Sequence, residues 1–328
     1  MPTIYDVAKL AGVSTYTVSA VLNRSAYVSP ELTQRVQKAV KELDYSINGL
    51  ARALQTRKTS TVGMLIPDIA NPFYAKVVRG VEDVLKEAGY SLILGNTYNQ
   101  LPEQTRYLGV FRSKQTDGIL LFSAAGGEDE LRQLVAARKP VVFVGRTPNN
   151  LKADSVSADN KRGTEMAVKY LISRGHKRIA IMPGETAVST GADRVAGWKS
   201  ALTRARLSAP DNLIAAGEWS AEFACSATGG FLAMPKPPTA IFAANFLLMT
   251  GILKALQELG TRCPDHVEVM SSDDSEWLDV FSPRISTVAQ PSYEMGEKAA
   301  KLLLKRIKTP KRRFQQIVLQ PELRIRES

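Results

Sequence analysis

From Thr61 onward the sequence alternates short apolar runs of strand length with segments of helical periodicity. Such alternation is typical of a parallel, doubly wound sheet with helices between successive strands. A second series of similar size starts after Asp159, so we expect two α/β lobes with a cleft between them. The expected strands cover residues 62–66, 91–94, 118–122, 141–144, 179–182, 240–243, 267–270, 285–289 and 316–325. The expected helices begin near Pro72, Pro102, Glu128, Lys161, Arg194, Ala221 and Phe246, and a last one covers 293–307.

The first 60 residues follow a different pattern, in which one short helix ends at Gly12 and the next begins after Ser14. Glycine tolerates the positive φ that ends a helix, and a serine hydroxyl can cap the following one. A buried stripe is expected at Val18, Val21 and Leu22, which recur at helical spacing. The residues expected to point outward are Thr15, Tyr16, Ser19 and Ala20. That outward face is short, uncharged and shaped for a DNA major groove, which predicts a helix-turn-helix. Taken alone, the same residues fit an ordinary amphipathic hairpin about equally well.

Two flanking helices are expected to complete a small three-helix core. Thr3 and Asp6 form a capping pair for a helix over 4–11, and Ser29 can cap a third helix that continues to Tyr45. These flanks favour the DNA-binding interpretation over the simple hairpin.

The charge of the chain indicates a polyanionic partner. The 328 residues carry a formal net charge of +11, and residues 298–328 hold ten lysines or arginines against two acidic residues. A basic excess points to nucleic acid only moderately, and a solvated helix end and loop would also account for the last block.

Cys225 and Cys263 have neither metal-ligand spacing nor the density of a disulfide scaffold, so reduced thiols are expected. With no signal peptide and no run of about 18 apolar residues, we expect a cytoplasmic, nucleoid-associated protein without membrane contact.

An enzyme is the competing class, because α/β lobes host many chemistries. The glycines near residue 191 lack the spacing of a phosphate-binding loop, and no GxGxxG follows the first strand. His176 lies in an expected helix-to-strand turn, where a structural role is more frequent than a catalytic one. A plain solute-binding protein would share the lobes, but it would carry a secretion signal and lack the first 60 residues. We therefore expect no catalytic residue, metal ligand or cofactor.

Five segments together make the sequence resemble the lactose-repressor (LacI/GalR) family of bacterial transcription regulators. They are "DVAKLAGVSTYTVSAVLN", "ARAL" before a basic linker, "IPDIANPFYAKVVRGVEDVLKEAGY", "RGHKRIA" and "STVAQPSYEMGEKAAKLLL". The resemblance runs from Thr3 to Glu327. It implies a head that binds a palindromic operator as a dimer, and a periplasmic-binding-protein-like core that binds a small effector.

The resemblance also implies residue roles. In the head, Thr15, Tyr16 and Thr17 match positions that read bases or contact phosphates, and Leu54 matches the hinge residue that wedges into the minor groove. The DNA-binding residues expected on this basis are Thr3, Ser14, Thr15, Tyr16, Thr17, Ser19, Ala20, Asn23, Asn48, Ala51 and Leu54. The effector-binding residues expected are Phe73, Arg146, Arg194, Trp219, Asn245, Phe246, Asp273 and Gln290. Without the resemblance, the aromatic members of this second set would be assigned to the core.

Several positions depart from the family pattern. Ala20 replaces the usual arginine, which removes a guanine contact, and Ile47 replaces the usual proline before the hinge. Gly145 and Phe246 stand where the family often has carboxylates, and Ser271-Ser272 replaces a glycine-aromatic pair. Loss of acids beside retained arginines favours an anionic effector, a sugar acid or sugar phosphate. A neutral sugar or a purine is the alternative.

The expected organisation has three parts: a DNA-binding domain over 1–47, a hinge helix and linker over 48–60, and an effector-binding and dimerisation core over 61–328. Within the core, an N-lobe is expected over about 61–160 and 289–318, and a C-lobe over about 161–288 and 319–328. The hinge is too short to persist alone and is expected to form on DNA. The function expected is a dimeric, ligand-controlled repressor of carbohydrate metabolism genes; without a heptad segment, no tetramer is expected.

Overall fold

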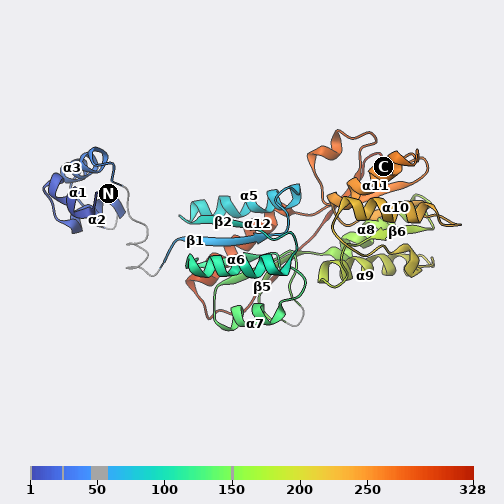
Figure 1. Ribbon diagram of the computed structural model, residues 1–328, viewed down its shortest axis with the longest axis horizontal. Helices are drawn as coiled ribbons and strands as arrows, with labels where there is room; N and C mark the ends of the chain where they lie inside the picture. Colours follow the sequence, from blue (N-terminus) through green and yellow to red (C-terminus); the bar gives the residue numbers. More distant parts are fainter. Residues whose placement is uncertain (1, 24–25, 46–57, 149–150) are drawn as a thin grey trace. The chain divides into compact units, whose positions relative to one another are not determined.

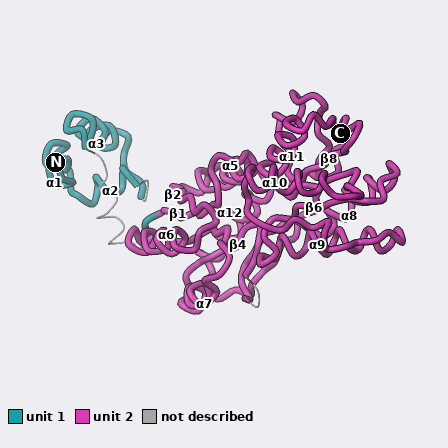
Figure 2. Tube along the Cα trace, turned by 45° about the vertical axis from the view of Figure 1, so that its right-hand side comes forward, with its two compact units in different colours: residues 1–59 teal, residues 60–328 magenta. Residues whose placement is uncertain are grey.

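The computed structural model describes residues 2–23, 26–45, 58–148 and 151–328. The chain forms two compact units, residues 1–59 and 60–328 (Figure 2). Three residues expected to bind DNA from the hinge, Asn48, Ala51 and Leu54, lie outside the described residues, as does Ile47. Within the described part of the chain, no helix is long and apolar enough to cross a membrane.

The first unit contains helices α1 (Ile4–Ala11), α2 (Thr15–Asn23) and α3 (Pro30–Glu42). The predicted local signals are confirmed: Thr3 and Asp6 form a capping box, and Gly12 ends α1 with a φ of 61°. The three helices share a hydrophobic cluster centred on Val7, Val18 and Val36, each with no exposed surface. This is the small core that the helical spacings predict.

Helix α2 has the predicted start but differs from expectation on its outward face. The Ser14 hydroxyl accepts a hydrogen bond from the Thr17 amide at 3.1 Å, which caps the helix. Ala20 was expected to point outward, and this was wrong, because the residue is only 2% exposed. A methyl group projects little from a helix, and longer residues three and four positions away share its face. Ala20 therefore cannot be counted as a surface that reads DNA bases.

The second unit contains two sheets. The first has the order β10-β5-β4-β3-β1-β2 with every pairing parallel. Its strands are β1 (Thr61–Ile66), β2 (Ser91–Asn96), β3 (Gly118–Leu121), β4 (Val141–Val144), β5 (Asp154–Ala158) and β10 (Gln316–Leu319). The helices of this N-lobe are α5 (Pro72–Glu87), α6 (Leu101–Ser113), α7 (Glu128–Ala136) and α12 (Ser292–Lys308).

Helices cover both faces of the N-lobe sheet. α5 and α12 pack on one hydrophobic cluster of the sheet, and α6 and α7 pack on another (Figure 1). The close approach of α5 and α12 depends on two glycines. A Cβ at Gly80 would lie 2.2 Å from the Tyr293 carbonyl oxygen, and a Cβ at Gly296 would lie 2.1 Å from the Val77 carbonyl oxygen.

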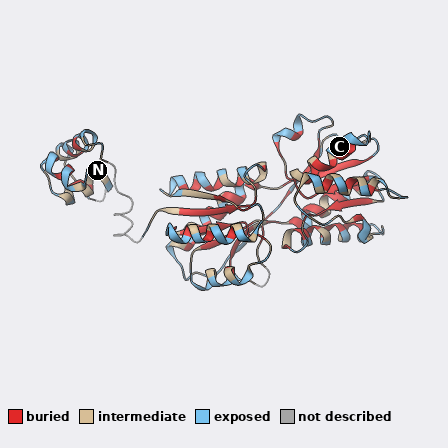
Figure 3. Ribbon diagram, viewed as in Figure 1, coloured by how far each residue is buried: buried red, intermediate tan, exposed pale blue. Residues whose placement is uncertain are grey.

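The second sheet, in the C-lobe, has the order β11-β9-β8-β7-β6. Its strands are β6 (Ile179–Met182), β7 (Ala240–Ala243), β8 (Glu268–Ser272), β9 (Ser286–Ala289) and β11 (Glu322–Arg324), of which β11 is antiparallel to β9. The flanking helices are α8 (Asn160–Ser173), α9 (Ser189–Arg204), α10 (Ala221–Leu232) and α11 (Phe246–Glu258), with short 3₁₀ turns η1 (Asp211–Leu213) and η2 (Glu276–Asp279). Figure 3 shows that buried residues concentrate in the strands and on the inner faces of the helices of each lobe. The doubly wound architecture is therefore confirmed for both lobes.

Three details differ from the sequence expectations. Strand β5 was not predicted, because its polar residues, including Asp154, mask a strand that is nonetheless buried. The single strand expected over 316–325 is two strands that belong to different sheets. Pro321 interrupts the run, since proline lacks the amide needed to continue a ladder. Helix α9 begins at Ser189, one and a half turns before the expected Arg194.

Candidate effector site and DNA-reading surface

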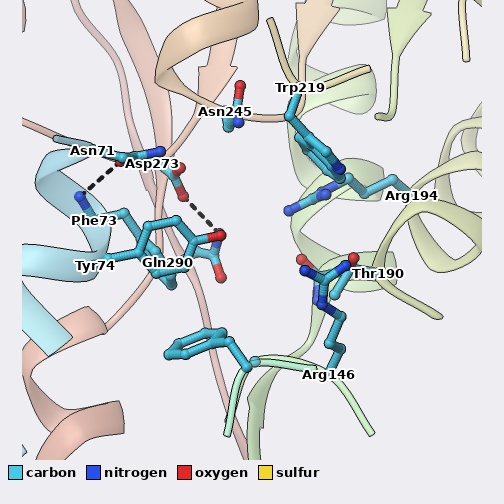
Figure 4. Close-up of a pocket in the computed structure, with 13 residues that line it drawn as sticks. Asn71, Phe73, Tyr74, Arg146, Thr190, Arg194, Trp219, Asn245, Asp273 and Gln290 are labelled. Atoms are coloured by element: carbon cyan, nitrogen blue, oxygen red, sulfur yellow. Dashed lines mark hydrogen bonds between the residues drawn. The ribbon is translucent and has the colours of Figure 1, made fainter. Parts of the chain in front are cut away.

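A cavity of about 50 Å³ lies between the two lobes of the second unit. It is lined by Asn71, Phe73, Tyr74, Phe122, Gly145, Arg146, Asn160, Thr190, Arg194, Trp219, Asn245, Asp273 and Gln290 (Figure 4). We refer to it as the effector cavity. A volume of this size holds a few water molecules but no sugar ring, whereas ligand pockets commonly span 300–1,000 Å³.

The topology of the sheets explains why these residues meet. Most follow directly on the carboxyl end of a parallel strand, the edge at which ligands bind in open α/β sheets. Asn71 and Asn245 also cap helices: their Oδ1 atoms accept hydrogen bonds from the amides of Phe73 and Leu248, each at 2.9 Å. The caps fix the two asparagines at the rim of the cavity.

Two arginines dominate the electrostatics of the effector cavity. Arg146 is 8% exposed and donates to the Asn99 side-chain oxygen at 2.5 Å. Arg194 is 6% exposed, donates to the Pro183 carbonyl oxygen at 3.4 Å, and has a buried Nε that meets no hydrogen-bond acceptor in the described structure. Burial lowers the pKa of both guanidinium groups. Neither forms an ion pair with a described residue at 4 Å or less.

One carboxylate lines the cavity together with these cations, and Glu185 and Asp193 act electrostatically on Arg146 and Arg194 from outside the lining. Asp273 is 9% exposed, adopts a left-handed φ of 69°, and accepts a hydrogen bond from the Gln290 amide at 2.7 Å. Burial raises the pKa of Asp273 to about 6, although the positive charge of Arg194 acts in the opposite direction. Burial also raises the pKa of Tyr74 to about 12, so its phenol remains a hydrogen-bond donor at neutral pH.

Aromatic rings form two walls of the effector cavity. Phe73, Tyr74 and Phe122 pack edge to face with ring centroids 5.0–6.3 Å apart. Trp219 lies on the opposite side beside Arg194, whose Cζ is 5.6 Å from the indole centroid (Figure 4). The indole Nε1 of Trp219 is buried and meets no acceptor in the described structure.

Seven of the eight expected effector residues line this one cavity, and Phe246 does not. Phe246 is the first residue of α11 and is partly buried against the hydrophobic core of the C-lobe, so its expected contact with an effector stays a prediction. The lining residues that were not expected are Asn71, Tyr74, Phe122, Asn160 and Thr190. These residues follow strands β1, β3 and β5 or lie near the start of α9. That position in the sequence is the signal that could have identified them as cavity residues.

Of the eight expected DNA-binding residues that the structure describes, four are exposed, three are half-buried and Ala20 is buried. Tyr16 is 73% exposed, so its ring is free to contact DNA. Ser14 and Thr17 share a hydroxyl hydrogen bond of 2.9 Å, and Asn23 donates to the Ser19 carbonyl oxygen at 3.0 Å. Thr3 is exposed and Thr15 is half-buried. Their contacts with DNA remain predictions.

His176 has a structural environment. One ring nitrogen lies 2.8 Å from the Thr239 hydroxyl, and the other lies 2.8 Å from the buried Glu268 carboxylate. Both nitrogens are thus engaged away from the effector cavity. Among the residues that the structure describes, no group of three or more histidine, cysteine or acidic side chains could hold a metal ion.

A helix-turn-helix head joined to a two-lobed core with a polar cavity defines a class of protein, the DNA-binding regulators controlled by small ligands. Residues 3–48 match the model for bacterial regulatory proteins of the lacI family, and residues 168–328 match that for periplasmic-binding-protein-like domains. The chain is 37% identical over 325 residues to the HTH-type transcriptional repressor PurR of Vibrio atlanticus, covering 98% of this chain and 97% of that one. PurR of Photobacterium profundum is 35% identical and covers 100% of this chain and 98% of its own length.

Solved structures agree with this assignment. The transcriptional regulator CelR in complex with cellobiose is 33% identical, covers all of both chains and superposes with a TM-score of 0.76. The lac repressor dimer bound to operator and the anti-inducer ONPF is 24% identical, with 99% and 98% coverage and a TM-score of 0.88, which shows a shared fold. The chain belongs to the lacI family. It is a ligand-responsive transcriptional repressor and not an enzyme.

Proposed function

We propose that the chain is a dimeric repressor whose affinity for a palindromic operator is set by an anionic effector, a sugar acid or a sugar phosphate. The observation that carries this proposal is the pair of buried guanidinium groups, Arg146 and Arg194, in a cavity with one carboxylate. A carboxylate or phosphate satisfies a guanidinium fork far better than a hydroxyl does.

The charge balance of the effector cavity favours an added negative charge. Two cations line the cavity with Asp273, whose pKa of about 6 allows its carboxylate to carry at most one negative charge against them at neutral pH. A buried charge without a partner destabilises the protein, so a ligand that supplies a negative charge gains more binding free energy here than a neutral ligand. Arg194 lines the cavity and has an Nε without a partner among the described residues, so its guanidinium is the group that gains most from an anion.

A planar purine is the second candidate. The edge-to-face rings of Phe73, Tyr74 and Phe122 on one side and Trp219 on the other offer stacking surfaces for a flat heterocycle. Relatives named PurR are consistent with this possibility, and the relative bound to cellobiose is consistent with a neutral sugar.

The small volume of the effector cavity supports a mechanism in which binding separates the lobes. An effector too large for about 50 Å³ must widen the gap between N-lobe and C-lobe as it enters. In a two-fold dimer this shift changes the spacing of the hinge segments and so the affinity for operator. The coupling is a difference in effector affinity between two lobe arrangements.

Calorimetry of the full chain with four probes tests the proposal: gluconate, glucose 6-phosphate, glucose and adenine. We expect an anionic probe to bind, and Arg194→Ala to weaken it by about tenfold or more, since hydrogen bonds to charged groups contribute roughly 1.5–3 kcal/mol. Arg204→Ala, on the same helix but 62% exposed, is the matched control and should change affinity little. Tight binding of glucose or adenine, with no response to either anion, would refute the charge argument.

A further inference from the structure

A second cavity lies at the opposite edge of the N-lobe sheet. It measures about 510 Å³, and the charged residues that line it are Arg138, Lys139, Arg306, Lys311 and Arg312. None of its lining residues, all of which the structure describes, is acidic. We refer to it as the basic cavity. Its size lies in the range of small-molecule sites.

The basic cavity is distinct from the effector cavity. Val141, which lines it, is the first residue of β4, and Asp154 and Gln316 begin the neighbouring strands β5 and β10. These strands are parallel, so their amino ends share one edge of the sheet, whereas the effector cavity lies at their carboxyl ends. β1 also begins at this edge, at Thr61, directly after the linker from the DNA-binding head.

A buried ion pair builds the wall of the basic cavity. Arg306, 5% exposed, contacts the fully buried Asp154 at 2.7 Å. Its other nitrogens donate to the carbonyl oxygens of Pro310, Arg312 and Arg313 at 3.0, 2.6 and 3.2 Å. Arg306 therefore uses its donors inside the protein and fixes the loop between α12 and β10. The site is ordered before any ligand arrives.

Arg312 has a hydrogen-bond donor without an acceptor. Its Nη2 donates to the Gln315 side-chain oxygen at 2.7 Å, whereas its Nη1 is buried and meets no acceptor among the described residues. Native proteins leave few such groups, because a buried donor that loses its water without gaining an acceptor destabilises the fold. Lys139 is half-buried next to it in the lining, and its ammonium donates to the Thr116 carbonyl oxygen. Two partly desolvated cations thus face one cavity.

The rest of the lining is apolar. Val135, Ala136 and Val141 contribute aliphatic surface, and Phe314 is a 50% exposed ring that stacks near Arg306, with 4.8 Å between its centroid and Cζ. A small inorganic anion would leave this surface uncovered. An organic anion would cover it with its body while its charged group meets the cations.

We propose that the basic cavity binds a small phosphorylated organic molecule, with the phosphate on Arg312, Lys311 and Lys139 and an apolar or aromatic body against Phe314. Phosphate has the acceptors that the guanidinium of Arg312, with its unpaired Nη1, lacks among the described residues. The ring of Phe314 gains by packing against the body of the ligand. This site is independent of the effector cavity and of the ligand that binds there.

Titration calorimetry of the full-length protein with phenyl phosphate and with inorganic phosphate tests the proposal. We expect phenyl phosphate to bind about tenfold more tightly than phosphate, an increment of about 1.4 kcal/mol. Phe314→Ala should remove that difference. Arg312→Gln and Lys311→Gln should each weaken both probes by several-fold or more.

Arg313→Gln is the matched control, because it removes the same charge one residue away but does not line the cavity. We expect it to change either affinity by less than twofold. An equal loss in Arg312→Gln and Arg313→Gln would overturn the proposal in favour of diffuse attraction. If phenyl phosphate does not bind at 10 mM, the proposal is also overturned. This holds even if Arg312→Gln changes the salt dependence of DNA binding, because that effect needs no ligand site. Abolition by Arg194→Ala would instead place the ligand in the effector cavity and also overturn it. The unfolding temperature of each variant shows whether it is still folded. Lys311 is exposed, so Lys311→Gln is the substitution that disturbs the fold least.

Discussion

Replacing Asp273 by asparagine should stabilise the ligand-free protein at neutral pH. The pKa of this carboxyl group is raised from 3.8 to about 6, mainly by burial. Its protonated form is favoured in the folded state, so this contribution to stability is complete below pH 3.8 and is lost as the pH rises through 6. A shift of about 2 units corresponds to about 3 kcal/mol at pH 7. Asparagine keeps an oxygen that can accept the Gln290 hydrogen bond of 2.7 Å without the buried charge.

The assay is thermal unfolding of the core from pH 4 to pH 8. We expect Asp273→Asn to melt roughly 6–12 °C above wild type at pH 7, from about 2–4 °C per kcal/mol in a domain of this size. The advantage should vanish near pH 4. Asp274→Asn is the matched control, for which we expect the unfolding temperature to change in the opposite direction. Asp274 accepts a hydrogen bond from Thr287 at 2.9 Å and forms an ion pair with Arg326, also at 2.9 Å.

These contacts lower the pKa of Asp274, so its stabilising effect is present at neutral pH and is lost on acidification. Asp274→Asn should therefore destabilise the protein at pH 7. If Asp273→Asn also lowers the unfolding temperature at pH 7, the attraction between the Asp273 carboxylate and Arg194 outweighs the cost of burying that charge, and the argument that burial dominates this group is wrong.

The remaining predictions concern the cavity wall, the head, the hinge and the assembly. Gly184 has a φ of 78°, and a Cβ there would lie 2.1 Å from Trp219, so Gly184→Ala should displace the indole; unchanged tryptophan fluorescence and effector affinity would argue against this. Ala20→Arg should destabilise the head by roughly 1–3 kcal/mol because Ala20 is buried, and a new preference for guanine in binding-site selection without loss of stability would contradict that. Leu54→Ala should weaken operator binding by a few kcal/mol and reduce the DNA bend, which a gel-based bend measurement checks. Sedimentation should show a dimer at micromolar concentration, and a stable tetramer would disprove the expected assembly.

Local signals in the sequence predict much of this fold, because they act through neighbouring residues. Gly12 and Ser14 define the turn between α1 and α2 through backbone conformation and capping, and the structure has both. Strand β5 could not be predicted from its own residues. Asp154 is tolerated in the sheet only because Arg306, distant in sequence, reaches it at 2.7 Å. Burial of this kind depends on tertiary contacts that a single sequence does not display.

The same contrast applies to the effector cavity. Its strand-end position could be predicted from the alternating pattern, and Arg194 and Asp273 were expected there and line it. The direction of individual side chains could not be predicted: Phe246 follows the lining residue Asn245, yet is partly buried against the core. Ala20 was misjudged for a related reason, since a helical pattern places a residue on a face but does not reveal what covers it.

The central claim is that a ligand in the effector cavity controls binding to DNA. Fluorescence anisotropy with an operator selected from random DNA tests it most directly, with and without the anionic effector found by calorimetry. We predict a palindromic operator whose dissociation constant changes about 5- to 150-fold with the effector, the usual range of allosteric coupling. In Arg194→Ala, operator binding should persist and this response should disappear. An operator affinity that is the same with and without a saturating effector would contradict the account.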